Sequence, residues 1–273
     1  MAKLVLQSAN AVSQTLLIAL HARVLEARRS APLVRDSRAA DLAAQLDYDP
    51  TRMVLSREDQ FMTILRLRQF DRRVADFLAR TARPTVVHIG CGLDTRFDRV
   101  DNGLVRWFDL DLPEVISLRR QLIPQTRRSR MIPCSALDPD WMDRISAKGE
   151  FCLFAAEGVF PYFEAEQVRW LVQTLERRFP GCELVFDALS PPMMRVHQIQ
   201  LRLCRLGPLL RWGLRSPQEV EAWADGVHLM QAWYYFDQPE PRLGAAQLMR
   251  YVPGLARGAG VFHFKLGDPG APS

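Results

Sequence analysis

The sequence predicts an α/β fold in which a doubly wound, Rossmann-like parallel sheet is covered by helices on both faces. Two observations support this class. Short apolar segments recur between residues 86 and 186 and alternate with stretches of helical spacing, an alternation typical of parallel sheets. The chain has 273 residues and is 48% hydrophobic, which suffices for one large domain with its own core.

Residues 1–80 are expected to form a helical cap. Apolar residues recur at helical spacing over 13–26 and again from Phe61 to Leu78. Ser56 precedes the second stretch in a pattern typical of a helix N-cap, with Glu58 and Asp59 following it. Pro84 ends the helical part of the chain.

Residues 81–189 are expected to form the α/β core. A first strand at 86–89 leads into Gly90-Cys91-Gly92, and a second at 105–108 is followed by a helix with Pro113 near its start. A third strand ends near Cys134, a fourth covers 151–155, and a fifth covers 184–186 after a helix over 164–179. Residues 190–226 are predicted as a helical lid and 227–273 as closing strands. These parts favour a single integrated domain, residues 1–273.

Charge and cysteine usage exclude several classes of partner. The net charge is +5, and all but three of the 36 Lys and Arg residues are arginines. Asp and Glu are interleaved with most of the arginine pairs, so a solvated surface is favoured over a face for nucleic acid. The five cysteines lack C-x-x-C spacing, as expected of reduced thiols rather than of zinc ligands or disulfides. No apolar run reaches the ~18 residues of a membrane span, so we expect a soluble, cytoplasmic protein without a membrane partner.

The residues that point to a ligand follow the first two strands. Gly90 and Gly92 allow a sharp turn and a close approach of the backbone to a ligand. Asp109 and Asp111 end the second strand, 19 and 21 residues after Gly90. At that spacing a carboxylate accepts hydrogen bonds from ribose hydroxyls. Together these features predict an adenosine-bearing ligand at the carboxyl ends of the strands.

Among such ligands the sequence favours S-adenosyl-L-methionine. Thr95 stands where a dinucleotide fingerprint has its third glycine, which counts against NAD, and the chain has no Walker-type phosphate loop. S-adenosyl-L-methionine has no pyrophosphate to bind at a helix N-terminus, and its cationic sulfonium suits carboxylates and apolar walls. Asp138 and Asp187 are isolated in the sequence, so we expect no metal ion.

Residues 86–97, 107–115 and 156–163 together carry a family signature. Its most specific parts are Leu93-Asp94-Thr95-Arg96 and Asp111-Leu112-Pro113. They resemble the leucine carboxyl methyltransferase family, and within it the branch of bacterial polyketide O-methyltransferases of the tetracenomycin type. The resemblance extends over about residues 12–267 and includes the block at 233–237.

The resemblance implies a class I S-adenosyl-L-methionine-dependent methyltransferase and suggests roles for individual residues. It places Gly90 beside the methionine moiety, Asp111 on the ribose, Arg66 on the cofactor's carboxylate and Glu157 near its amine. Tyr162 is expected near the methyl-transfer site as the catalytic residue. The other residues expected around the cofactor are Cys91, Gly92, Asp109, Leu112, Ser135 and Ala136.

Two positions depart from the family pattern. His88 stands where related methyltransferases carry an acid or an Asn, and we interpret it as a buried core histidine rather than a base. Ser135 stands where the family has an acid that binds the adenine amino group. A serine accepts a hydrogen bond without charge, so adenine recognition is expected to be weaker or shifted.

The nature of the methyl acceptor stays open. A carboxylate needs no base at pH 7, whereas a phenol gains from one. His197 and His228 are possible bases, but the sequence around each is more typical of a surface or packing histidine. The resemblance places the acceptor pocket beneath the Met- and Leu-rich lid, where Arg195, Arg202 and Arg205 would suit an acidic acceptor.

The sequence therefore predicts an S-adenosyl-L-methionine-dependent O-methyltransferase that acts on a carboxylate or a phenolic hydroxyl. The acceptor is expected to be a small, polyketide-like natural product, apolar or aromatic and acidic. The alternatives are methylation of a protein C-terminal carboxylate and a non-catalytic module that binds S-adenosyl-L-methionine.

Overall fold

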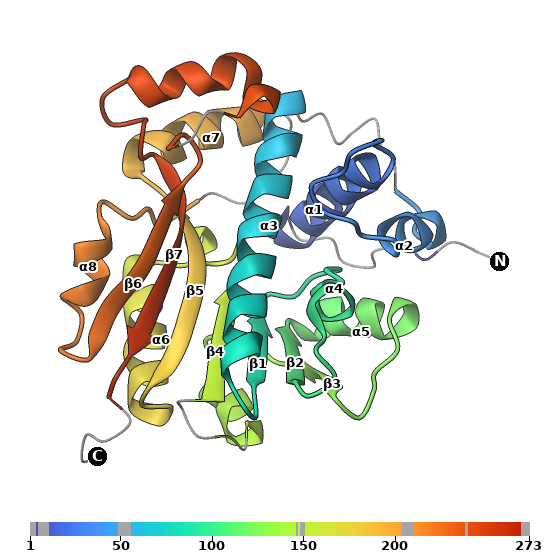
Figure 1. The fold of residues 1–273 in the computed structure, drawn as a ribbon, viewed down its shortest axis with the longest axis vertical. Helices are drawn as coiled ribbons and strands as arrows, with labels where there is room; N and C mark the ends of the chain where they lie inside the picture. Colours follow the sequence, from blue (N-terminus) through green and yellow to red (C-terminus); the bar gives the residue numbers. More distant parts are fainter. Residues whose placement is uncertain are drawn as a thin grey trace.

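The computed structural model describes residues 4, 11–48, 56–145, 147, 151–203, 210–237 and 240–268. Within these ranges it contains a seven-stranded sheet of order β3-β2-β1-β4-β5-β7-β6. Helices cover both faces of this sheet (Figure 1). The predicted α/β class is confirmed.

The strands lie in segments where the sequence predicts them, with β6 and β7 inside the residues 227–273 that are expected to form closing strands. They are β1 (Thr85–Ile89), β2 (Arg106–Asp111), β3 (Ser129–Pro133), β4 (Cys152–Ala156), β5 (Cys182–Leu189), β6 (Val227–Tyr234) and β7 (Ala259–Leu266). β1 to β5 pair in parallel, as their alternation with helices predicts, whereas the closing strand β7 is antiparallel to both β5 and β6. Antiparallel neighbours need no helical crossover, so the chain returns through η5 (Pro241–Tyr251) and inserts β7 between β5 and β6.

The helices form two groups, one in the amino-terminal part and one between the strands. They are α1 (Ala11–Ala27), α2 (Ala39–Gln45), α3 (Arg57–Arg80), α4 (Arg96–Val100), α5 (Pro113–Leu122), α6 (Ala165–Arg178), α7 (Pro191–Leu203) and α8 (Pro217–Glu221). Ser56 caps α3 as predicted, because its Oγ accepts a hydrogen bond from the Asp59 N–H at 3.0 Å.

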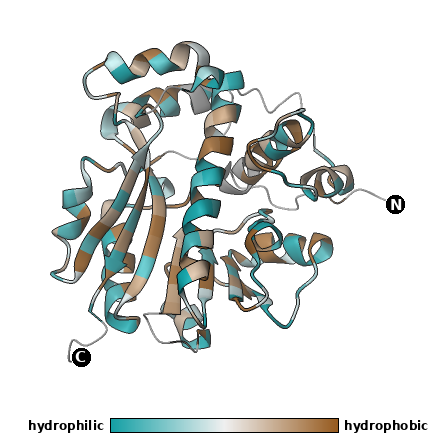
Figure 2. Ribbon diagram, viewed as in Figure 1, coloured by the Kyte–Doolittle hydropathy of each residue, from teal (hydrophilic) through white to brown (hydrophobic). Residues whose placement is uncertain are grey.

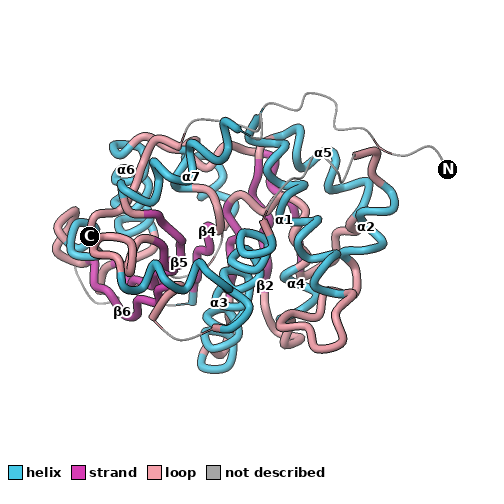
Figure 3. Tube along the Cα trace, turned by 90° about the horizontal axis from the view of Figure 1, so that it is seen from above, coloured by secondary structure: helices cyan, strands magenta, loops and turns pink. Residues whose placement is uncertain are grey.

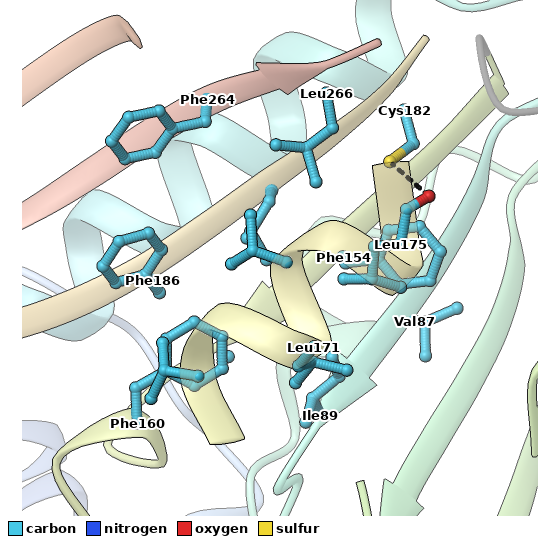
Figure 4. Close-up of a cluster of buried hydrophobic side chains, with 14 of the residues drawn as sticks. Val87, Ile89, Phe154, Phe160, Leu171, Leu175, Cys182, Phe186, Phe264 and Leu266 are labelled. Atoms are coloured by element: carbon cyan, nitrogen blue, oxygen red, sulfur yellow. Dashed lines mark hydrogen bonds between the residues drawn. The ribbon is translucent and has the colours of Figure 1, made fainter. Parts of the chain in front are cut away.

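One face of the sheet packs against α6. Leu171 and Leu175 of this helix lie beside the aromatic side chains of β4 and β5, among them Phe154 and Phe186 (Figure 4). The Phe186 and Phe264 rings stack with their centroids 5.6 Å apart. This continuous apolar layer holds the central strands in register.

The other face packs against α3. Phe70, Val74 and Phe77 are fully buried against strand residues that include Val86 and Trp107. In the view from above β4 and β5 lie between α3 and α6 (Figure 3), and α3 carries hydrophobic and hydrophilic positions in alternating bands (Figure 2). The carboxyl-terminal half of α3 is thus a layer of the core, whereas the sequence pattern places residues 1–80 in a helical cap.

The carboxyl ends of the parallel strands are covered by segments from both ends of the chain. α7 and η5 lie beyond the carboxyl end of β5 (Figure 1), and α1 packs against α2 and α3. Cys91, Cys134 and Cys182 are free thiols, whereas Cys204 lies outside the described residues. In the described ranges, no helix has the length and apolarity needed to cross a membrane.

Candidate functional site

A cavity of about 930 Å³ opens at the carboxyl ends of β1, β2, β4 and β5. Nearly all the predicted site residues line it: Arg66, Gly90, Cys91, Gly92, Asp111, Leu112, Ser135, Ala136, Glu157 and Tyr162. Asp109 is not part of its wall. The volume lies near the upper end of the ~300–1,000 Å³ range of ligand pockets, so the cavity has room for a nucleoside and a second ligand.

The turn after β1 presents backbone rather than side chains to the cavity. Gly90 has a φ of 65° and Gly92 a φ of 49°, in the left-handed region that favours glycine. A Cβ atom at Gly90 would overlap the Val159 side chain, so a larger residue would displace the loop after β4. The N–H groups of Gly90 and Cys91 both donate to the Leu110 carbonyl, at 2.8 and 3.2 Å, which fixes the turn against β2.

Asp111 ends β2 at the cavity wall. Its Oδ2 accepts a hydrogen bond from the Gly92 N–H at 2.7 Å, and its Oδ1 accepts one from the Leu112 N–H at 2.8 Å. Burial raises the pKa of this carboxyl above its usual value, and the two backbone hydrogen bonds act against that increase. Each carboxylate oxygen has a second lone pair, so Asp111 can also accept hydroxyl donors from a ligand.

Asp109 lies inside the sheet and serves the same loop indirectly. Its carboxylate accepts hydrogen bonds from Arg119 Nη2 and from Trp107 Nε1, both at 2.8 Å. Arg119 in turn donates to the carbonyls of Gly92 and Asp94, at 3.0 and 2.6 Å. The predicted contact of Asp109 with the cofactor therefore finds no support in the geometry, because Arg119 covers this carboxylate.

Arg66 reaches the cavity from α3 and joins the ends of β4 and β5. Its Nε donates to Glu157 Oε1 at 3.0 Å and its Nη1 to Asp187 Oδ2 at 3.1 Å. Asp187 Oδ1 also accepts a hydrogen bond from the Gly158 N–H at 2.6 Å. Nη2 of Arg66 has no hydrogen-bond partner among the described residues, so it can bind an anionic group of a ligand.

Asp187 is the site residue that sequence reasoning missed. This acid is isolated in the sequence, yet it lies near the carboxyl end of β5, next to β4 in the sheet. Its position near the end of an apolar strand could have identified it as a site residue. An acid at the end of an apolar strand is also the feature that identifies Asp111 on β2.

Buried arginines fix the loop that follows β1. Arg96 donates to Asp71 Oδ1 at 2.7 Å, to His88 Nε2 at 3.0 Å and also to Glu157. Among the described residues, ion pairs around this loop join five arginines to six carboxylates. They are Arg23, Arg66, Arg96, Arg99 and Arg119 with Asp36, Asp71, Asp94, Asp109, Glu157 and Asp187. The carboxylates outnumber the arginines, so the site suits a cationic ligand. These arginines are not the solvated surface charges that the composition suggested.

The two departures from the family pattern have different surroundings. His88 is buried, with its Nε2 accepting from Arg96 and its Nδ1 lying 3.7 Å from Asp109 Oδ1, which confirms a core histidine. It also touches the cavity wall. Ser135 lies on the loop after β3, where its Oγ accepts a hydrogen bond from the Leu137 N–H at 3.2 Å. Its own hydroxyl proton is free to be donated to a ligand.

The end of the cavity beneath the lid is apolar. Its walls come from α3, α7, the segment before α8, the segment after β6, and η5, which the sequence does not predict. They include Met62, Met193, Val196, Ile199, Leu210, Phe236, Ala246 and Met249. Arg195 and Arg202 are exposed on α7 and do not line the cavity, and Arg205 lies outside the described residues. The expected arginine contacts with an acidic acceptor therefore find no support at Arg195 and Arg202.

Polar groups also reach this apolar end. Tyr162 enters from η4 (Phe160–Tyr162), Tyr235 from the segment after β6, and His197 from α7. Burial raises the pKa of Tyr235 and lowers the pKa of His197. His228 is exposed on β6, as predicted, whereas His197 lines the cavity instead of packing elsewhere. Over the described ranges, no group of three or more His, Cys, Asp or Glu side chains is placed to hold a metal ion.

The family of the chain follows from comparison with known proteins. The family model of the leucine carboxyl methyltransferases matches residues 16–176, more than half of the chain. The chain belongs to the leucine carboxyl methyltransferase family. It is 32% identical over 253 residues to the tetracenomycin polyketide synthesis O-methyltransferase TcmP of Streptomyces glaucescens, covering 89% of this chain and 93% of that protein. It is 29% identical over 235 residues to the S-adenosyl-L-methionine-dependent methyltransferase dpfgK of Gibberella zeae, covering 78% and 79%.

The fold agrees with this assignment. A solved structure from Thermobifida fusca YX aligns with a TM-score of 0.55 at 17% identity, covering 92% of this chain and 94% of that one. Together with the strand order 3-2-1-4-5-7-6 and the antiparallel β7, this is the fold of the class I S-adenosyl-L-methionine-dependent methyltransferases. The protein is a methyltransferase, as the sequence predicted.

Proposed function

We propose that this enzyme transfers a methyl group from S-adenosyl-L-methionine to an oxygen of a small, polyketide-like natural product, at a carboxylate or a phenolic hydroxyl. The observation that carries the proposal is that one cavity has two unlike ends, which we call its two chambers. One chamber has an excess of carboxylates around a glycine turn, which suits a cationic cofactor. The other is apolar, which suits an aromatic acceptor.

The residues present fit the cofactor. Asp111 would accept hydrogen bonds from the ribose, and Arg66 Nη2 would bind the methionine carboxylate. Glu157 would lie near the amine, and we add Asp187 because it holds Arg66 and the Gly158 N–H. Cys91, Gly92, Leu112, Ser135 and Ala136 would form the remaining walls around adenosine. We keep Asp109 as a positioning residue that acts through Arg119.

At the acceptor end the chain's main task is alignment. Methyl transfer is an in-line displacement, for which correct placement of the two reactants supplies ~7–11 kcal/mol of the barrier. Tyr162 lines the cavity and is our candidate for contact with the reacting groups. The similarity to TcmP supports a small-molecule acceptor.

We infer that cap, core, lid and closing strands act as one domain, since the cavity takes its walls from all four. The free thiols of Cys91 and Cys182 support a reducing compartment such as the cytoplasm.

Calorimetry tests the proposal directly. Wild-type protein should bind S-adenosyl-L-methionine and S-adenosylhomocysteine, and Asp111→Ala should weaken both at least tenfold. Asp143→Ala, which removes an exposed partner of Arg178, is the matched control and should bind normally. A wild-type protein that binds neither ligand contradicts the proposal. Binding without methyl transfer to any small acceptor favours the non-catalytic module, and transfer only to a peptide C-terminus favours a protein substrate.

A further inference from the structure

Tyr235 is a buried tyrosine in the wall of the cavity. It follows β6 directly, and its N–H donates to the Ala259 carbonyl at 3.2 Å. The residue is 7% exposed and lines the cavity. The roles proposed for Arg66, Glu157 and Tyr162 leave its hydroxyl group unused.

The register of the sheet places Tyr235 on the same face as Asp187. Leu189, two residues after Asp187 on β5, lies opposite Ala259 of β7. Tyr235 lies opposite Ala259 on the other side of β7, because it continues the register of β6 against β7 by one residue. Residues directly opposite each other share a face of a sheet, and so do residues two apart on one strand. The side chain of Tyr235 therefore points to the face that carries Asp187, where α3 brings Arg66.

Tyr235 lies where the charged strand end of the cavity meets its apolar end. Its ring belongs to an apolar cluster with Leu65 of α3 and Met193 of α7. Its hydroxyl group lies near enough to Arg66 and Asp187 for their charges to act on its pKa. The ring is thus packed among apolar residues, while the hydroxyl group is close to the charged groups.

The hydroxyl group of Tyr235 is a hydrogen-bond donor without a partner. Burial raises its pKa, and Asp187 and Glu157 raise it further against the opposing effect of Arg66, so the proton stays on the oxygen. Among the described residues this hydroxyl group has no hydrogen-bond partner. A ligand that fills the cavity displaces the water around it, and a buried hydroxyl group without a partner costs free energy. The ligand is therefore expected to supply an atom that accepts this hydrogen bond.

The position of Tyr235 favours the acceptor over the cofactor as that ligand. On this side of the sheet the strand order is β4-β5-β7-β6, and Glu157 and Gly158 follow β4. A Cβ at Gly158 would lie 3.3 Å from Arg66 Nη2, so the group proposed to bind the methionine carboxylate lies on the β4 side. Tyr235 reaches the cavity from the β6 side, in the same cluster as Met193 of the lid. The lid covers the chamber proposed for the acceptor.

We propose that the Tyr235 hydroxyl group donates a hydrogen bond to an oxygen of the methyl acceptor and holds the acceptor beside the methionine end of the cofactor; this rests on the proposed methyltransferase function. The oxygen that it binds is not the one that attacks, because a donor there would hold the electron pair that forms the new bond. In a carboxylate it is the second oxygen, and in a phenol it is a neighbouring carbonyl oxygen. The acceptor is therefore an aromatic compound in which such an oxygen lies next to the methylated one.

Three probes with one ring system test this contact in the complex with S-adenosylhomocysteine. 2-Naphthoate and 2-acetonaphthone carry such an oxygen, and 2-isopropylnaphthalene has nearly the same shape without it. Tyr235→Phe keeps the ring and removes only the hydroxyl group. It should weaken binding of 2-acetonaphthone about three- to tenfold and of 2-naphthoate about 10- to 100-fold, since a hydrogen bond to a charged group contributes more. Its affinity for 2-isopropylnaphthalene should not change.

Fluorescence titration measures these dissociation constants. Unchanged affinity for both oxygen-bearing probes overturns the proposal. An equal loss for all three probes does so as well, because the hydroxyl group would then only maintain the shape of the chamber. A wild-type complex that binds none of the three probes also overturns it.

The neighbouring tyrosine supplies the matched control. Tyr234 ends β6, packs its ring against Phe262 with the centroids 5.6 Å apart, and does not line the cavity. Tyr234→Phe should bind all three probes like the wild type.

Calorimetry with S-adenosylhomocysteine separates this inference from the proposed function. Wild-type protein that does not bind S-adenosylhomocysteine rejects the methyltransferase site itself. Normal binding by the wild type and by Tyr235→Phe, with unchanged probe affinities, rejects only the contact of Tyr235 with the acceptor. A loss of S-adenosylhomocysteine affinity in Tyr235→Phe also overturns this contact, because the hydroxyl group would then serve the cofactor.

Discussion

The two ends of the cavity are built by different means. At the strand end, the glycine turn is held by backbone hydrogen bonds to Leu110 and by arginines whose every charge is paired. At the lid end, the walls are Met, Val, Leu and Phe side chains, and Ile199 is 59% exposed.

This difference separates a rigid binding site for the cofactor from an adaptable binding site for the acceptor. Directional ion pairs and backbone hydrogen bonds fix positions, as binding of a constant cofactor requires. Flexible apolar side chains such as Met193 and Met249 adjust to ligands of different shape. Substitutions at the strand end should therefore affect stability and cofactor binding together, and substitutions at the lid end should affect the acceptor alone.

The largest effect is expected at Arg96. Replacing it by Leu removes one of the arginine partners of Asp71, Asp94 and Glu157, which keep Arg99 or Arg66 nearby. Removing one partner from buried ion pairs costs ~3–5 kcal/mol. Urea unfolding measures the loss, and calorimetry should show that cofactor binding falls with it. Arg178→Leu removes an exposed pair with Asp143 and should cost at most ~1 kcal/mol. Similar losses of unfolding free energy in Arg96→Leu and Arg178→Leu would contradict the view that buried ion pairs stabilise the strand end of the cavity.

A buried ion pair at the opposite end of β5 should affect stability alone. Glu183 accepts hydrogen bonds from Arg80 Nη1 at 2.7 Å and from His263 Nε2 at 2.8 Å. Burial favours a higher pKa, but His263 and Arg80 outweigh it and lower the pKa of Glu183 to about 2. Because the unfolded pKa is ~4.3, this stabilisation is complete above about pH 4.5 and is lost as the pH falls toward 2, by roughly 3 kcal/mol.

Glu183→Gln should flatten that pH dependence. Unfolding free energies of variant and wild type, measured in urea from about pH 5 downward, give the difference. Cofactor affinity at pH 7 should not change, since Glu183 does not line the cavity. A variant that keeps the acid sensitivity of the wild type argues against this assignment.

A smaller effect is expected from the close approach at Gly90. Gly90 and Gly103 both have positive φ, 65° and 80°, so an alanine strains either position by ~1–2 kcal/mol. Gly103 has open space around it, whereas a Cβ at Gly90 meets Val159. Gly90→Ala should therefore also weaken S-adenosyl-L-methionine binding about tenfold, and Gly103→Ala should leave it unchanged. Adding Val159→Ala should restore part of the affinity; no rescue would mean that the contact is unimportant.

The smallest effect on stability is expected at the lid. Ile199→Ser changes an exposed side chain that lines the acceptor chamber, so the free energy of unfolding should shift by less than ~0.5 kcal/mol. Acceptor KM should change severalfold while cofactor affinity stays constant, as steady-state kinetics and calorimetry would show. A parallel change in cofactor affinity would mean that the two ends are not independent.

The sequence allowed the strand end to be predicted because its signals are local. Gly90 and Asp111 follow directly from strand ends and turn chemistry, which neighbouring residues determine. Asp109 shows where such reasoning fails, since it lies two residues before Asp111 on the same strand. Asp109 lies opposite His88 in the register of β2 against β1, so this carboxylate stays inside the sheet. Only the packed structure shows that Arg119 covers the Asp109 carboxylate.

The sequence by itself determined the α/β class, the five parallel strands, the Ser56 cap, the glycine turn and the family, because periodicity, turn residues and contiguous motifs are properties of short segments. Tertiary structure alone decided the direction of β7, the use of Asp187 and the arrival of His197 and η5 at the cavity. The Arg66–Asp187 contact joins residues 121 positions apart. Contacts across such separations depend on how the helices pack on the sheet, and no local pattern records that packing.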